Sequence, residues 1–188
     1  MNGLVIAYSG RMAKTGRRGS ATQEVQWLTD DELSSYLSLV RLMTWLPWSI
    51  DQQLQRDSQL RLVEYQTLAM LSNNADHTMR MSELAEITNA SLSRLSHVVS
   101  RLEARGWVRR EPCPGDGRFI NAVLTDDGWA KVVATAPGHV AAVRRLLIDV
   151  LTPEQLRELG AISDEVLIGL AQSTIIPNGR VASPAPPD

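Results

Sequence analysis

Residues 81–106 read MSELAEITNASLSRLSHVVSRLEARG, and this stretch decides the fold. Ser82 can cap a short helix that the pair Asn89-Ala90 then interrupts. Ser91 can cap a second helix that ends before Gly106, because glycine is typical of the first position after a helix. The apolar stripe of this second helix consists of Leu92, Leu95, Val99 and Leu102. Two helices joined by a tight polar turn predict a helix-turn-helix.

The spacing changes after Gly106. Residues 107–110 and 119–124 are short strand-like runs, separated by a segment with two prolines and two glycines, which predicts a hairpin with a long loop. A hairpin directly after a helix-turn-helix is typical of a winged helix, whose loop reaches a DNA minor groove. Arg118 would supply the cation that the negative potential of a narrow groove attracts. We expect Asp116 to hold the shape of the wing by pairing with an arginine or with loop amides.

Two more helices are indicated upstream of the helix-turn-helix. Thr29 and Glu32 fit a capping box, in which each side chain bonds the backbone amide of the other residue. Apolar residues follow at helical spacing, and Pro47, which lacks a backbone donor, should kink or divide this helix. Residues 63–72 repeat the helical pattern, and residues 73–76 indicate a turn.

Two helices are also indicated downstream of the hairpin. Thr125 can cap the first, which Pro137-Gly138 should bend or interrupt. Residues 152–155, Thr-Pro-Glu-Gln, place a cap, a proline at the first helical position and a capping-box partner in the order that opens a helix. That helix should run to about residue 171. The sequence therefore predicts an α+β fold, mainly α, in which terminal helices flank a winged helix-turn-helix.

Composition limits the class of protein. The chain has 188 residues, 44% hydrophobic and 21% charged, which suits one domain or two small ones and excludes a disordered chain. No apolar run approaches the ~18 residues that a bilayer span needs, so we expect no membrane partner. Cys113 is the single cysteine, which indicates a cytoplasmic protein and favours an inert thiol over a redox trigger.

Catalytic, metal and cofactor sites are not indicated by the sequence. The three histidines have no Cys or His partner at metal-ligand spacing. No Ser-His-Asp pattern, phosphate-binding loop, dinucleotide motif or paired carboxylates suited to acid–base catalysis is present. We therefore expect no enzymatic activity, no metal and no cofactor.

The net charge of −2 hides an uneven distribution. Lys and Arg minus Asp and Glu give +4 in residues 1–20, −5 in residues 21–79, +2 in residues 80–118 and −3 in residues 119–188. Within residues 91–118, six arginines stand against three acids. Since an acidic average can hide a basic face, a polyanionic partner is compatible with this composition.

The polar face of the helix that follows Ser91 suits a DNA major groove. At about 100° per residue, the side opposite the apolar stripe carries small and basic groups. They are Ser93, His97, Ser100, Arg101 and Ala104, with Arg94 at the edge. Arginine can bond guanine O6 and N7, and serine or histidine can bond base edges or phosphates. The alternatives are an ordinary surface helix, a winged-helix module that binds an acidic protein partner, and ligand sensing without DNA binding.

Five stretches of the chain match one family pattern. They are residues 81–85 (MSELA), 91–96 (SLSRLS), 101–110 (RLEARGWVRR), 116–118 (DGR) and 124–128 (LTDDG). Together they resemble the multiple antibiotic resistance regulator (MarR) family of winged-helix transcriptional regulators, over roughly residues 29–171. The most specific part is the Leu-Glu-x-Arg-Gly signature combined with the Asp-x-Arg motif of the wing.

The resemblance implies a ligand-responsive homodimeric repressor that binds double-stranded DNA at a pseudo-palindromic operator, with half-sites roughly 34 Å apart. The predicted DNA-binding residues are Ser91, Ser93, Arg94, His97, Arg101 and Arg118, with Asp116 as the brace of the wing. Two departures matter. His97 stands where the family commonly has Arg or another polar residue, which leaves base preference open. Gly117 replaces a second Arg in the wing motif, which implies a weaker or looser wing.

The resemblance also implies a domain organisation. Residues 29–60 and 126–171 would form dimerisation helices, and residues 61–125 the DNA-binding lobe. We expect a flexible basic arm at residues 1–28 and a disordered, proline-rich tail at residues 172–188. The internal Met12 leaves open a translation start downstream of Met1.

Three aromatic residues could line an effector pocket. Trp45, Trp48 and Tyr65 would lie between the dimerisation and DNA-binding parts, where the family commonly binds small aromatic or lipophilic molecules. The same residues could instead serve core or dimer packing.

Overall fold

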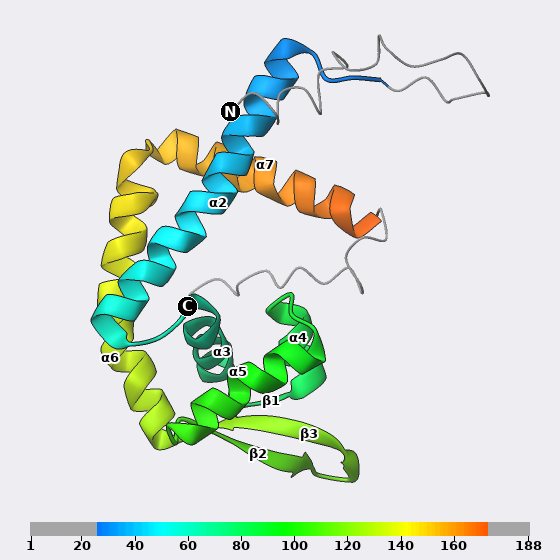
Figure 1. Cartoon of the computed structure of the whole chain (residues 1–188), viewed down its shortest axis with the longest axis vertical. Coiled ribbons are helices and arrows are strands. Elements are labelled where there is room, and N and C mark those ends of the chain that lie inside the picture. The colour runs from blue at the N-terminus through cyan, green and yellow to red at the C-terminus, as the bar shows by residue number, and fades with distance from the viewer. Residues whose placement is uncertain (1–25, 173–188) are drawn as a thin grey trace, which may run out of the picture. The chain divides into compact units, whose positions relative to one another are not determined.

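The computed structural model describes residues 26–172. The arm expected at residues 1–28 and the tail expected at residues 172–188 lie almost entirely outside these described residues. The chain divides into two compact units, with the boundary between Trp48 and Ser49. The second unit contains the helix-turn-helix and the hairpin (Figure 1).

Helix α2 (Asp30–Ser58) begins at the predicted capping box. The Thr29 amide donates to Glu32 Oε2 at 2.7 Å, and the Glu32 amide donates to Thr29 Oγ1 at 3.3 Å. Of the two outcomes expected at Pro47, the division is wrong, because α2 continues through this residue to Ser58, and the kink stays a prediction. A proline removes a single rung of the hydrogen-bond ladder, and a helix of this length keeps many others on both sides.

Three helices and a short strand follow in the order α3 (Leu62–Asn73), β1 (Thr78–Arg80), α4 (Met81–Ile87) and α5 (Leu92–Ala104). The predicted cap at Ser82 is wrong. Helix α4 begins two residues before the start at Glu83 that this cap predicts, at the buried Met81 directly after β1, and its N-cap residue, Arg80, makes no side-chain cap bond. Packing of Met81 into the core therefore sets this helix start.

The apolar stripe of α5 differs from the prediction at one position. Leu95, Val99 and Leu102 are buried, but 55% of Leu92 is exposed, and Val98 takes its place in the core at 3%. Leu92 is the first residue of α5 and lies before the part of the helix that packs on the core. Gly106 follows the helix with φ +74°, as expected of a residue after a helix end.

The sheet is antiparallel, with strand order β1-β3-β2. Strands β2 (Val108–Cys113) and β3 (Asp116–Leu124) form the predicted hairpin, but the long loop is wrong. Cys113 pairs with Asp116, so Pro114-Gly115 alone connect the strands. The pairing shifts between Pro112, opposite Ile120, and Cys113, and the additional residues of β3 are absorbed in this bulge.

Helix α6 (Asp126–Leu146) starts at Thr125, whose hydroxyl accepts from the Gly128 amide at 3.0 Å. It continues through Pro137, so of the two outcomes predicted there the interruption is wrong and the bend stays a prediction. A 3-10 turn, η2 (Ile148–Val150), leads to α7 (Pro153–Gln172). The predicted capping box of α7 is confirmed, with Thr152 N to Gln155 Oε1 at 2.9 Å and Gln155 N to Thr152 Oγ1 at 3.2 Å.

One apolar core holds the second unit together. Its fully buried side chains come from the C-terminal end of α2 and from α3, α4 and α5, and include Leu54, Leu60, Leu68, Leu71, Leu84, Leu95, Val99 and Leu102. The sheet adds Val108, Ala122 and Leu124. We call residues 62–124, from α3 to β3, the lobe. A helix-turn-helix followed by a hairpin on a three-stranded sheet confirms the predicted winged helix-turn-helix.

Candidate nucleic-acid interface

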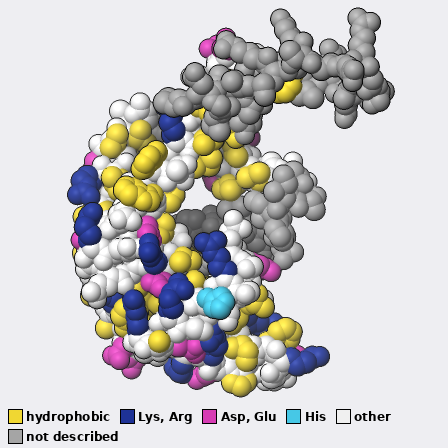
Figure 2. Space-filling model, viewed as in Figure 1, with side chains coloured by type: hydrophobic (Ala, Val, Ile, Leu, Met, Phe, Trp, Pro, Cys, Tyr) yellow, Lys and Arg dark blue, Asp and Glu magenta, His cyan; other side chains and the backbone are white. Residues whose placement is uncertain are grey.

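The first turn of α5 presents a polar surface. Ser91 caps the helix by accepting a hydrogen bond from the Arg94 amide at 3.2 Å. Ser91, Ser93, Arg94 and His97 are all exposed, so four of the predicted DNA-binding residues are accessible at the cap and in the first two turns of one helix. Figure 2 shows Lys and Arg side chains spread over the lobe, with acidic side chains between them.

The wing carries a paired arginine at its tip. Arg118 donates from Nε to Asp116 Oδ1 at 2.9 Å and from Nη2 to Oδ2 at 2.7 Å, and its amide also donates to Oδ1 at 3.2 Å. These bonds from Arg118 hold the pKa of the Asp116 carboxyl below its usual range. The Arg118 side chain remains 85% exposed. Such a geometry is what a bracing role for Asp116 requires, and the role itself stays a prediction.

Arg110 ties the wing to α5, and the sequence reasoning missed it. From β2 its Nη2 reaches the Ser96 carbonyl at 2.7 Å and Ser100 Oγ at 3.1 Å, and its guanidinium pairs with Glu103. The Arg110 amide also donates to Glu103 Oε1 at 3.0 Å. These contacts hold the hairpin and the helix together. Glu103 and Arg110 have opposite charges and lie seven residues apart. Because a turn separates α5 from β2, this spacing alone does not predict that the two side chains meet.

A groove of about 430 Å³ lies between α5, the start of α4 and the wing. Leu92, Phe119 and Ile120 give it apolar walls, and Arg110 and Arg118 add positive charge. The exposure of Leu92 is explained by this position, because the residue faces the groove rather than the core.

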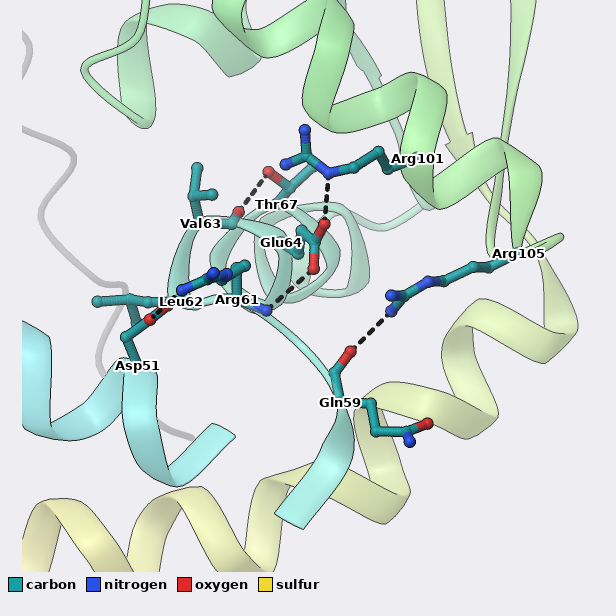
Figure 3. Close-up of polar contacts among 9 residues, drawn as sticks. All are labelled: Asp51, Gln59, Arg61, Leu62, Val63, Glu64, Thr67, Arg101 and Arg105. Carbon is teal, nitrogen blue, oxygen red and sulfur yellow. Dashed lines mark hydrogen bonds and ion pairs between the residues drawn. The ribbon is translucent and has the colours of Figure 1, made fainter. Parts of the chain in front are cut away.

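Arg101 of α5 bonds to α3, and Arg105, the C-cap residue of α5, bonds to the chain that precedes α3 (Figure 3). Arg101 Nε donates to Glu64 Oε1 at 2.8 Å, and Arg105 Nη1 donates to the Gln59 carbonyl at 2.7 Å. The sequence predicts that Arg101 contacts DNA. In the structure it has an internal partner, and its contact with DNA stays a prediction.

The aromatic residues predicted to bind an effector lie in different surroundings. In α2, Trp45 and Trp48 pack edge to face, with ring centroids 5.5 Å apart, and both remain exposed. Tyr65 on α3 is buried, and its ring lies 4.6 Å from that of His139 on α6. Burial raises the pKa of Tyr65 and lowers the pKa of His139. A common pocket for the three aromatic residues stays a prediction.

Neither a metal site nor a membrane span is found in the part of the chain that the structure describes. Within residues 26–172, no three His, Cys, Asp or Glu side chains come close enough to hold a metal ion. Over the same residues, no helix has both the length and the apolar character that crossing a bilayer requires.

A sequence model of the MarR family matches residues 58–118. Among curated proteins, the transcriptional regulator PecS of Dickeya dadantii is 34% identical over 91 residues, which cover 48% of this chain and 52% of PecS. The transcriptional repressor NicR of Pseudomonas putida is 33% identical over 89 residues, which cover 47% of this chain and 55% of NicR. The chain thus spans about half the length of the curated relatives it matches.

Solved structures match over a larger part of the chain. Sco3205 of Streptomyces coelicolor, a MarR family transcriptional regulator solved in complex with DNA, is 46% identical with a TM-score of 0.76. That match covers 79% of this chain and 93% of Sco3205. AbsC, a MarR family regulator from the same organism, is 40% identical with a TM-score of 0.72, over 79% of this chain and 97% of AbsC.

Proposed function

The chain belongs to the MarR family of transcriptional regulators, and we propose on this premise that it binds double-stranded DNA as a homodimer at a pseudo-palindromic operator. Its relatives are transcriptional regulators and not enzymes, in agreement with the sequence-based expectation. The DNA in the Sco3205 structure supports the same class of partner here.

The major-groove contacts are assigned to the first turns of α5. Ser93, Arg94 and His97 are exposed on a helix whose start is fixed by the Ser91 cap. Arginine is suited to guanine, and the short serine side chains let the helix backbone approach the groove. The cap bond is made by the Arg94 amide itself, so the cap also fixes the backbone position of Arg94.

The minor-groove contact is assigned to Arg118. Its guanidinium is the most exposed member of the ion pairs described above, and Asp116 holds it from one side only. Arg110 links the wing to α5, which supports simultaneous engagement of neighbouring grooves by the two elements. The exposed polar face of α5 together with this anchored wing is the observation that carries the proposal.

The homodimer is supported by the exposed apolar side chains of α7. None of the residues of this helix is buried within the described chain, and Ile162 and Val166, one turn apart, each expose at least half of their surface. A helix with apolar residues and no buried face gains stability by packing against a partner. We assign that partner to a second copy, with residues 29–60 and 126–171 as dimerisation helices and residues 61–125 as the DNA-binding part.

Regulation would be steric. A dimer on its operator would exclude polymerase, and a repressor is the described role of NicR. We further propose that a small aromatic or lipophilic effector releases the protein, with the exposed pair Trp45 and Trp48 as its first contact. Such a role would place the chain in the cytoplasm with the DNA that it regulates.

The decisive experiment selects bound fragments from random duplex DNA and then measures affinity against salt concentration. We expect a palindromic site with half-sites about one helical turn apart. Arg94→Ala and Arg118→Ala should each weaken binding. Arg118→Ala should also lower the slope of log affinity against log salt, and Arg94→Ala should relax the preference for the base pair that Arg94 bonds. Arg157→Ala on α7 is the charge control, because it removes an exposed arginine from a helix with no proposed DNA contact. Since α7 belongs to the proposed dimerisation helices, this variant must also sediment as the wild type does. If both interface variants bind as wild type does, the DNA interface is misassigned.

The dimer is tested separately by analytical ultracentrifugation. The wild type should sediment as a dimer at micromolar concentration, and Ile162→Asp with Val166→Asp should shift it towards monomer. A monomeric wild type would contradict the dimer.

A further inference from the structure

The α2–α3 junction, which we define as residues 59–61, is held in an unusual conformation. Gln59 has φ +55°, a left-handed conformation that is costly for a residue other than glycine. Leu60 anchors the junction in the core and is fully buried. The junction joins α2, which we assign to dimerisation, to the lobe that carries the proposed DNA interface. The backbone conformation of the junction therefore sets the direction in which α3, the first helix of the lobe, leaves α2.

Two arginines from one face of α5 bond to this region. Arg105 donates to the Gln59 carbonyl at 2.7 Å, one helical turn along α5 from Arg101. Arg101 reaches Glu64, and Glu64 Oε2 in turn accepts the Arg61 amide at 2.9 Å. Both arginines thus act on the junction, one directly and one through Glu64 (Figure 3).

The end of α2 holds the same junction from the other side. Asp51 Oδ1 accepts the Leu62 amide at 2.8 Å, and Asp51 Oδ2 pairs with Arg61 Nη1 at 2.9 Å. The first amides of α3 are therefore bonded by two carboxylates, Asp51 from α2 and Glu64 from α3 itself. This arrangement links α2, the junction and α5 in one continuous set of polar contacts.

The burial of Glu64 makes its partner indispensable. Only 3% of the Glu64 side chain is exposed, whereas 52% of Arg101 is exposed. A buried carboxylate without a cation is strongly unfavourable, because the charge has lost its water. If Arg101 left Glu64 to reach a DNA phosphate, this cost would oppose the binding of the phosphate.

We propose that Arg101 is a positioning residue, which with Arg105 clamps α5 to the α2–α3 junction and sets the orientation of the recognition helix. This inference rests on the proposed DNA-binding function and revises the role of Arg101 within it. DNA affinity then depends on Arg101 through Glu64, and not through a contact between the guanidinium and DNA.

A double-mutant cycle tests the proposal. Arg101→Gln leaves the buried Glu64 carboxylate unpaired and should weaken binding to the selected operator about 3- to 30-fold, the range typical of residues coupled in one polar network. Glu64→Gln keeps the shape and removes the buried charge, so it should change affinity less than about threefold. Adding Glu64→Gln to Arg101→Gln should restore most of the lost affinity, because the two amides can bond each other.

Salt dependence separates positioning from contact. A residue that touches phosphate contributes about one to the slope of log affinity against log salt. We expect the Arg101→Gln protein to keep both the wild-type slope and the wild-type base preference, whereas Arg94→Ala, at an assigned base contact, should relax the preference at one base pair of each half-site. Overturning results would be a reduced slope for Arg101→Gln, or a double variant that binds as weakly as Arg101→Gln. Arg157→Gln with Glu154→Gln on α7 is the control pair, with both side chains exposed. Because α7 belongs to the proposed dimerisation helices, these variants must also sediment as the wild type does.

Thermal unfolding of the same variants keeps the two proposals apart. The clamp predicts a lower Tm for Arg101→Gln and recovery in the double variant, whether or not DNA is present. Should the wild type select no DNA while this thermal cycle holds, the proposed function fails and only the structural clamp stands. A Tm unchanged in Arg101→Gln would overturn the clamp even if the wild type binds DNA.

Discussion

Gly128, in the first turn of α6, is the position where one added carbon should cost most. A Cβ there would lie 2.1 Å from the Trp107 carbonyl oxygen and 2.7 Å from Leu124 Cδ1. The start of α6 is bonded to the same segment, with Thr125 N to Trp107 O at 3.1 Å and Thr125 Oγ1 to the Gly106 carbonyl at 2.7 Å. Gly128→Ala must therefore push the helix start away from the base of the hairpin.

The magnitude follows from the hydrogen bonds that this movement breaks and from the strain that remains. Two hydrogen bonds contribute about 1 kcal/mol each, and the overpacking strain adds about 1–3 kcal/mol. The higher helix propensity of alanine stabilises the folded state by about 1 kcal/mol, which offsets part of this loss. The net loss is about 2–4 kcal/mol, which for a chain of this size lowers the Tm by about 4–16 °C.

The matched control is Gly138→Ala in the same helix. Its added Cβ would meet only Gln53 Nε2, at an ordinary contact distance of 3.5 Å. Helix propensity then dominates, and the Tm should rise by a few degrees. Circular dichroism at one fixed protein concentration measures both variants, since a dimer makes the Tm concentration-dependent. A Gly128→Ala protein that melts at or above the wild-type temperature would refute the steric argument.

Three further predictions concern titration and capping. In Arg118→Ala the pKa of Asp116 should return towards its ordinary value, measured by NMR titration of the carboxyl, because Arg118 is the main cause of the lowered value; no change would mean that the ion pair does not form in solution. Burial lowers the pKa of His139, so the unfolded chain binds more protons below about pH 6.5 and the wild type should lose stability as pH falls from about 6.5 through the folded-state pKa. His139→Gln should flatten the fall in Tm between pH 7 and 5, and parallel curves for wild type and His139→Gln would count against the buried imidazole. Ser91→Ala removes the α5 cap and should lower the free energy of unfolding by about 1 kcal/mol in denaturant titrations, a loss that should be absent if the cap bond does not form.

Local signals predict the helix starts well. Thr29 with Glu32 and Thr152 with Gln155 form their capping boxes because both partners lie within one turn, where sequence spacing determines distance. Ser82 has a suitable N-cap side chain but no capping-box partner, and it does not cap, because α4 begins at the buried Met81 instead. Strand β1 has three residues, too few to show an alternating pattern, and forms because β3 offers it a partner.

Contacts over long sequence separation explain what the sequence could not reveal. The helical period correctly places Arg101 on the side of α5 away from the core. Its partner Glu64 lies 37 residues away, and no spacing rule connects them. The same holds for Arg105 and the Gln59 carbonyl, where the acceptor is a backbone atom and leaves no mark in the sequence.

The continuity of α6 makes it a lever arm. Its 21 residues give a length of about 30 Å at about 1.5 Å per residue. One end is bonded to the base of the wing through Thr125, and Pro137 leaves a rung of the ladder open near the middle, so bending would concentrate there. A tilt of about 5° at the Leu146 end would move the other end by about 2–3 Å over that length. Since a hydrogen bond spans about 3 Å, this displacement is enough to break the groove contact that we propose for Arg118.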